Sequence, residues 1–133
     1  MISEADIAQA LQQHLAGMTD VPAIAYENKD LPAGTARPYL VVETVRVSRI
    51  DRTLKGGKVE SRGYMQITVV DAVDQWAFPA ERLADDISER FAYPQSLAVT
   101  GGRVTITKPP AIQQGYRDGP NWRLPVRIDY LAT

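Results

Sequence analysis

The hydrophobic residues near the N-terminus repeat at helical spacing. Ile7, Leu11 and Leu15 lie four residues apart, so they share one face of an α-helix. We therefore expect an amphipathic helix from about Ser3 to Ala16. Ser3 can cap the start of this helix, and Gly17 is a natural stop after it.

A second and clearer helical pattern runs from about Phe78 to Ala92. Pro79 fits the first turn of such a helix, and Pro94 blocks its continuation. The apolar residues of one predicted face are Ala80, Leu83, Ala84, Ile87 and Phe91. The charged residues of the opposite face are Glu81, Arg82, Asp85, Asp86, Glu89 and Arg90. This separation predicts a helix that packs its apolar face on a core.

Short stretches of β-branched or alternating apolar residues predict strands. They are Ala23 to Glu27, Tyr39 to Val47, Ser61 to Val70, Val104 to Thr107 and Asn121 to Leu131. A polar segment with the turn signal Gly56-Gly57 separates the second stretch from the third, so we expect these two strands to form a long hairpin. Pro125 lacks a backbone N–H, which suggests that the last strand lies at a sheet edge or carries a bulge.

The predicted elements follow the order α-β-β-β-α-β-β. Hairpin-linked strands combined with amphipathic helices are typical of an α+β sandwich. We therefore expect a mixed, mostly antiparallel sheet of four to five strands, with two helices packed on one face. The chain of 133 residues fits a single domain over residues 1–133, and it shows no internal repeat.

Composition excludes several classes of function. The chain has no cysteine, so disulfides, thiol nucleophiles and Cys-based zinc sites are excluded. Its net charge is −1, so it has no overall basic field for nucleic acid. The N-terminus lacks the basic start and apolar run of a signal peptide, and no apolar stretch approaches the roughly 20 residues that span a bilayer. We expect a protein of an aqueous compartment, without membrane contact.

The sequence carries no pattern typical of a catalytic or metal site. His14 is the only histidine, and it lies off the apolar face of the first predicted helix, where an inert surface position is expected. With one histidine and no cysteine a hydrolase triad is nearly excluded, and the GxSxG motif is absent. Asp85 and Asp86 are adjacent on a helix, so they point in different directions. We expect no catalytic residue, no metal, no cofactor and no enzymatic activity.

One stretch of the chain concentrates positive charge. Between Arg46 and Arg62 the only acidic residues are Asp51 and Glu60. The basic residues, called the basic set below, are Arg46, Arg49, Arg52, Lys55, Lys58 and Arg62. On the predicted hairpin they would form an assembly-contact arm that reaches an acidic protein neighbour or passing DNA. The alternative is a charged hairpin end that prevents edge-to-edge pairing of strands.

Two further features leave alternatives open. Gly63 lies inside a predicted strand, which indicates either a bulge or a close approach of another group to the backbone, and a simple bulge is the favoured reading. The aromatic residues Trp76, Phe78 and Trp122 belong either to the core or to a subunit interface, because both environments use the same residue types.

Short motifs occur in an order and spacing that match a known family. They are Pro22 to Asn28, Pro38 to Leu40, Gly63 to Ile67, and Leu83 to Ile87 followed by Phe91. Their order also agrees with the order of the predicted elements. From about Ala10 to Phe91, and more loosely to the C-terminus, the chain resembles the tail terminators of lambda-like siphophages. That group includes bacteriophage-related domains of unknown function.

The resemblance implies a structural phage or prophage protein with a mixed α/β fold that assembles as a homohexameric ring. Such a ring caps the growing tail tube, ends its polymerisation and presents the surface that joins the head. The implied partners are other copies of the chain, the tail tube protein and a head–tail connector protein, and DNA could pass nearby. The implied locations are the host cytoplasm during assembly and then the virion tail. The alternatives are another head–tail neck or tail-completion protein and, with less support, a small ligand-binding domain or enzyme.

Overall fold

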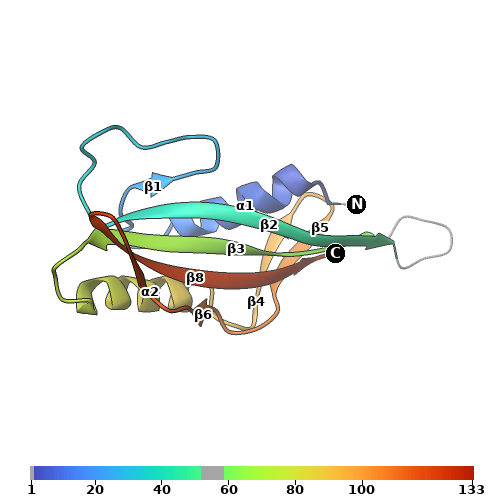
Figure 1. Cartoon of the computed structure of the whole chain (residues 1–133). Helices are drawn as coiled ribbons and strands as arrows, with labels where there is room; N and C mark the ends of the chain where they lie inside the picture. Colours follow the sequence, from blue (N-terminus) through green and yellow to red (C-terminus); the bar gives the residue numbers. More distant parts are fainter. Residues whose placement is uncertain (1, 52–58) are drawn as a thin grey trace.

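The computed structural model describes residues 2–51 and 59–133, which form two helices and one mixed sheet of eight strands (Figure 1). In chain order the elements are α1 Glu4–Ala16, β1 Ile24–Ala25, β2 Tyr39–Asp51, β3 Val59–Ala72, α2 Phe78–Arg90, β4 Gln95–Val99, β5 Gly102–Ile106, β6 Ala111–Ile112, β7 Tyr116–Asp118 and β8 Asn121–Ala132. The α+β class predicted from the sequence is confirmed. The expectation of four to five strands is wrong, because the sheet is larger.

The sheet has the strand order β1-β2-β3-β8-β5-β4, and the short strands β6 and β7 also pair with β8. Only the pairing of β1 with β2 is parallel among the described strands; the other pairings are antiparallel. The predicted hairpin of β2 and β3 is confirmed, and its strands run longer than the β-branched stretches indicated. The sequence reading missed β4, β6 and β7, and the last two have only two and three residues.

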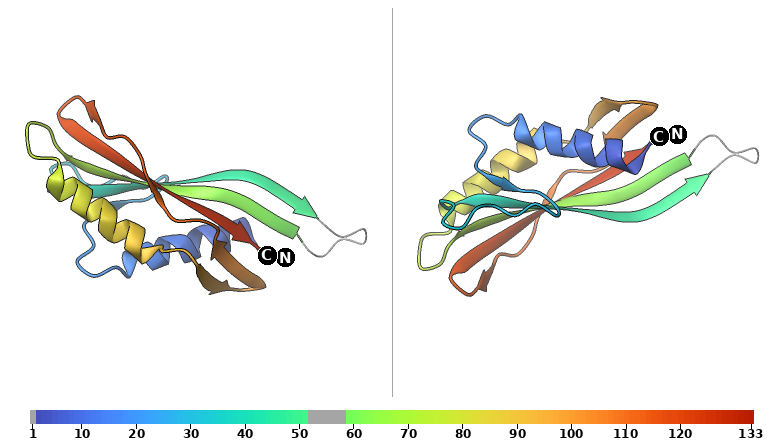
Figure 2. Two further views of the ribbon diagram at one scale, coloured as in Figure 1. Left: turned by 90° about the horizontal axis from the view of Figure 1, so that it is seen from below. Right: turned by 90° about the horizontal axis from the view of Figure 1, so that it is seen from above.

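Both helices lie on the same face of the β2-β3-β8 layer (Figure 2). Ile7, Leu11 and Leu15 of α1 are completely buried, as their spacing predicted. On α2 the buried residues are Ala80, Ala84 and Ile87, whereas Leu83 is only partly buried. Alternate residues of the sheet complete this core, and they are Leu40, Val42, Met65, Ile67, Val69, Leu124, Val126, Ile128 and Tyr130.

The ends of α1 follow the sequence prediction. The Ser3 side-chain oxygen accepts a hydrogen bond from the backbone N–H of Asp6 at 3.0 Å, which satisfies one of the free donors at the helix start. Gly17 ends the helix as expected. Pro79 lies at the start of α2, where its missing N–H costs no helical hydrogen bond.

The inference that Pro125 marks an edge strand or a bulge is wrong. β8 is central, because it pairs with β3 on one side and with β5, β6 and β7 on the other. The Pro125 carbonyl accepts a hydrogen bond from the N–H of Gln113 at 2.9 Å, so the backbone polar groups of this proline face the β6 and β7 side. The partner strand is interrupted there between Ile112 and Tyr116. A proline nitrogen therefore fits in the middle of the sheet.

Gly63 is explained by close approach rather than by a bulge of its own strand. The register of the β2–β3 pair shifts in β2 instead, between Arg46 and Ser48. A Cβ atom added at Gly63 would meet the Val45 carbonyl oxygen, and it would lie 2.8 Å from the hydroxyl oxygen of Tyr130. The glycine thus allows the Tyr130 ring to pack directly on the backbone of β3, at the point where the hairpin leaves the core.

Candidate functional site

The hairpin of β2 and β3 continues beyond the part of the sheet that the helices cover (Figure 1). We call residues 47–51 and 59–62 of this hairpin the arm. Its strands stay paired in register, from Ser48 opposite Arg62 to Asp51 opposite Val59. Two apolar side chains of the arm face solvent, with exposed fractions of 65% for Val47 and 45% for Ile50. The arm therefore exposes two apolar side chains beyond the core of the domain.

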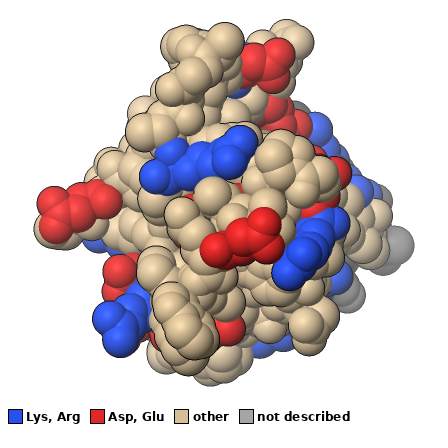
Figure 3. Space-filling model, turned by 60° about the vertical axis from the view of Figure 1, so that its left-hand side comes forward, with Lys and Arg blue, Asp and Glu red and all other residues tan. Residues whose placement is uncertain are grey.

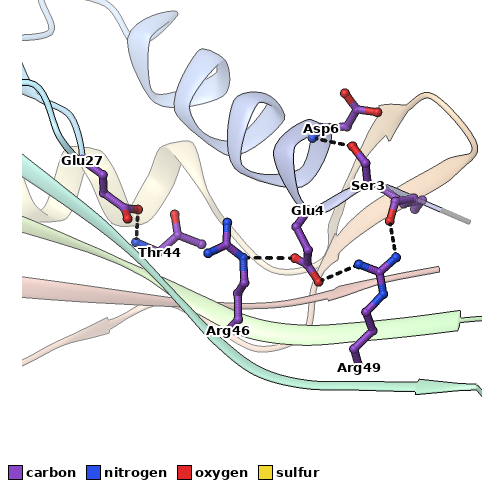
Figure 4. A network of polar contacts seen from close by, with 8 residues as sticks. Ser3, Glu4, Asp6, Glu27, Thr44, Arg46 and Arg49 are labelled. Carbon is purple, nitrogen blue, oxygen red and sulfur yellow. Dashed lines mark hydrogen bonds and ion pairs between the residues drawn. The ribbon is translucent and has the colours of Figure 1, made fainter.

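An ion-pair network ties the base of the arm to the N-terminus of α1 (Figure 4). The Glu4 carboxylate lies 3.5 Å from Nε of Arg46 and 3.4 Å from Nη1 of Arg49. Nη2 of Arg49 also donates a hydrogen bond to the backbone carbonyl of Ile2 at 3.2 Å. Glu4 lies in the first turn of α1, where the helix dipole favours a negative charge. The network thus joins the base of the arm to the start of α1.

The six residues of the basic set have different environments. Arg46 and Arg49 come together around Glu4, so part of their charge is neutralised within the chain. Arg62 is exposed and neighbours Gly63 on β3, so it points to the sheet face away from Tyr130 and the helices. The other three, Arg52, Lys55 and Lys58, lie outside the described residues. The hypothesis of a basic contact arm therefore stays a prediction for these side chains.

A side chain, that of Glu27, binds one backbone group on the outer edge of β2, next to β1. β1 pairs with β2 only at Leu40 and Val41. Further along, the Glu27 carboxylate accepts a hydrogen bond from the backbone N–H of Thr44 at 2.6 Å (Figure 4). Such a contact occupies a donor that would otherwise be free to pair with another strand.

His14 does not occupy the inert surface position expected from the sequence. Its Nε2 atom lies 2.8 Å from the carbonyl oxygen of Arg90 and 3.1 Å from Nε2 of Gln95, and its ring packs edge-on against Phe91 at 4.9 Å. In return, Nε of Arg90 donates to the carbonyl of His14 at 2.8 Å. Burial lowers the pKa of His14 below its usual value. The hydrogen bond with the Arg90 backbone opposes this shift, and the Arg90 charge adds to it. The residue joins α1 to the end of α2.

The sequence reading missed a groove of about 470 Å³ on the sheet face away from the helices. Its lining comes mainly from the 28–38 loop and the start of β2. Both segments lie at the end of the molecule opposite the arm (Figure 1). Its lining includes Leu31, Ala33, Tyr39, Val41, Arg37 and Arg123. Charged side chains of both signs are scattered over this end of the molecule, and neither sign dominates (Figure 3).

The three aromatic residues that could belong to the core or to an interface have different surroundings. Trp122 packs partly buried against the core, whereas Trp76 and Phe78 are 79% and 59% exposed. The rings of Trp76 and Phe78 stack on each other, with centroids 6.1 Å apart. The sequence held a signal for this, because Trp76 follows the polar pair Asp74-Gln75 and precedes the first turn of α2, outside any periodic apolar pattern.

The described residues hold no group of three or more histidine, cysteine or acidic side chains that could bind a metal ion. Over the same part of the chain, no helix has the length and apolar character needed to cross a membrane. The surface features of the described residues are the arm, the groove and the exposed aromatic pair.

Comparison with known proteins identifies a family and a fold for this chain. A family model described as "Phage tail terminator protein" matches residues 6–130, nearly the whole chain. One solved structure aligns over 100% of this chain and 97% of its own length with a TM-score of 0.80; at 21% identity, this likeness shows the fold alone. A search of curated proteins gave no significant match.

Proposed function

The chain belongs to the phage tail terminator family, and on that premise we propose that it assembles into the ring that caps the tail tube. Membership in the family makes it a structural protein of a phage tail. The finer proposal is that a homohexameric ring of this chain ends tube polymerisation and then offers the surface to which the head attaches. The family match over residues 6–130 is the observation that carries this proposal.

The arm supports an assembly role. It extends beyond the helix-covered body, carries two exposed apolar side chains, and is held at its base by the Glu4 network. A neighbouring subunit or the tail tube could cover these two side chains and bury them in an interface. A ring also requires two different patches on each subunit, because its contacts are head-to-tail.

The proposed partners follow from this role. They are other copies of the chain, the tail tube protein and the head–tail connector protein, with phage DNA passing through the ring. Assembly would take place in the host cytoplasm, and the product would be a virion tail component. The family match favours a terminator over another neck component.

The proposal is tested with tail tubes grown from the purified tube protein of the same phage. We expect that adding the chain before growth is complete stops elongation, so that electron micrographs show shorter tubes with an extra ring at one end. A matched control adds a double variant of the arm, Val47→Ser with Ile50→Ser, which leaves the core intact. If tubes grow to the same length with and without the wild-type chain, the capping function is refuted.

A further inference from the structure

The outer side of β2 is an edge of the sheet over most of its length. β1 has only two residues, and it pairs with β2 at Leu40 and Val41. From residue 43 to residue 51, no strand of the described part of the chain pairs with this side of β2. Free backbone groups along such an edge can pair with a strand of another molecule, so a long edge exposes a protein to aggregation.

The Glu27 side chain continues the ladder of hydrogen bonds that β1 begins. The N–H of Leu40 donates to the Ala23 carbonyl at 2.9 Å, so it faces outward from β2. Alternate residues of a strand direct their N–H groups to the same side, so the N–H of Thr44 also faces outward. Its acceptor is the Glu27 carboxylate, at 2.6 Å (Figure 4). Glu27 and Thr44 are 17 positions apart in the chain, as are Ala23 and Leu40.

This common spacing gives Glu27 a defined place in the sheet. If β1 continued in the same register, the backbone carbonyl of residue 27 would accept the Thr44 N–H. The chain turns away instead, since Asn28 has a left-handed backbone with a φ of 57° and Tyr26 bridges to Lys29. The carboxylate therefore takes the place of the carbonyl that the turn removes. A charged acceptor also forms a stronger hydrogen bond than a neutral one.

The next part of the same edge is interrupted by a bulge. The register of the β2–β3 pair shifts between Arg46 and Ser48, and such a shift breaks the regular spacing of outward groups that an incoming strand requires. The charged side chain of Arg46 lies at this bulge. Thr44 is thus the outward donor between the part of β2 that β1 covers and the part that the bulge distorts. Without Glu27, a strand could pair with the edge at this point.

We propose that Glu27 guards the edge of β2, because its carboxylate prevents a strand of another copy of this chain from extending the sheet at Thr44. An incoming strand would offer a backbone carbonyl to the same N–H, so the carboxylate and the strand compete for one donor. This inference goes beyond the proposed ring and does not depend on it. Pairing of sheet edges would join subunits by a contact that no ring of fixed size requires.

Amide hydrogen exchange followed by NMR at low protein concentration tests the hydrogen bond itself. In the wild type, the Thr44 N–H should exchange slowly although it lies on an edge, and Glu27→Ala should speed its exchange about tenfold or more. The N–H of Val45 faces β3, so its exchange should be the same in both proteins. Glu27→Gln keeps an acceptor oxygen at the same reach and should retain most of the protection.

Self-association tests what the guard prevents. At equal concentrations, light scattering should give a larger average mass for Glu27→Ala than for the wild type, and infrared spectra should show added intermolecular β-sheet. Glu27→Asp keeps the charge but shortens the side chain by one carbon, so it should associate like Glu27→Ala. The matched control is Glu43→Ala, which removes the same charge from an exposed position on the same strand and should keep the wild-type mass.

Three results would overturn the proposal. If Glu27→Ala leaves the exchange of Thr44 unchanged, the carboxylate does not protect the edge. If exchange accelerates while the mass stays at the wild-type value, the bulge suffices and Glu27 is no guard. If Glu27→Asp keeps the wild-type mass, charge repulsion rather than the hydrogen bond separates the copies. Should Glu27→Ala fail to fold, Glu27→Asp and Glu27→Gln still give the comparison.

These measurements are independent of tube capping. Neither the exchange of Thr44 nor the mass difference between variants reports tube length. Failure of the guard therefore leaves the capping proposal standing, and tubes that grow unchanged in the presence of the chain would leave the guard standing.

Discussion

The two halves of the β2–β3 hairpin have opposite surroundings, although they belong to the same pair of strands. In the inner half, Val42, Met65 and Ile67 are completely or almost completely buried beneath the helices. In the arm, Val47 and Ile50 face solvent, and the Glu4 network provides the contact with α1. The arm is also the more polar half, because Ser48, Arg49 and Asp51 accompany Val47 and Ile50, yet its strands pair in the same ladder. The inner half therefore contributes to the core, whereas the apolar side chains of the arm remain on the surface.

The comparison is tested most strongly by truncating one isoleucine in each half. Ile67→Ala removes a completely buried side chain and should lower the free energy of unfolding by about 2–5 kcal/mol. Ile50→Ala changes a half-exposed side chain and should cost no more than about 0.5 kcal/mol. Urea unfolding followed by circular dichroism measures both. Equal losses for the two variants would show that the arm belongs to the folding core.

The junction between the halves gives the next largest effect. Gly63→Ala places a methyl group against the Val45 carbonyl and the Tyr130 hydroxyl, so the strand or the ring must move. We expect a loss of about 1–3 kcal/mol, the usual cost of overpacking. The second variant, Gly63→Ala with Tyr130→Leu, tests whether the tyrosine is the obstacle. No loss for the single variant in thermal unfolding would contradict the close approach.

The anchor of the arm should contribute little to stability and more to assembly. Glu4→Gln removes the charge that faces Arg46 and Arg49, and partly exposed ion pairs contribute about 0–1 kcal/mol. The variant should therefore unfold at nearly the wild-type temperature yet cap tubes less well, because the base of the arm loses its contact with α1. Glu81→Gln on the exposed face of α2 is the control. A variant that caps tubes as well as the wild type would show that the anchor has no role in assembly.

The body of the protein should also respond to pH through His14. Its pKa is lowered in the folded state, so the unfolded chain binds the proton more tightly. The stabilisation is complete above the unfolded value of about 6.5 and is lost as pH falls toward the lower folded value. His14→Gln lacks this loss, so the stability difference between wild type and variant should shrink from pH 8 to pH 5. Parallel stability curves over that range would contradict the assignment.

The sequence predicted the parts of the fold that depend on periodic burial. The stripes of α1 and α2 and the alternation along β8 are satisfied locally and by one common core, so pattern alone located them. Sequence pattern failed to predict the surroundings of a residue where these depend on a partner far away in the sequence. Pro125 reads as an edge residue, yet the gap between β6 and β7 accepts it in a central strand. His14 reads as a surface residue, yet the end of α2 meets it from 76 positions away.

The candidate site was only partly predictable for the same reason. The charge between Arg46 and Arg62 indicated an arm, but the pairing of Arg46 and Arg49 with Glu4 depends on how α1 crosses the hairpin. The groove combines the 28–38 loop with β2 and Arg123, segments whose proximity no local pattern records. Trp76 and Phe78 were noticed as aromatic residues, and only burial distinguished them from Trp122.

The central claim is that this chain forms a ring that ends tail growth, and its mass in solution tests this most directly. Light scattering should be measured over a wide concentration range, with and without short tubes of the tail tube protein. The account predicts a hexamer, either for the free chain as its concentration rises or at the ends of the tubes. A monomer at every concentration, together with tubes that bind none of it, would contradict the account.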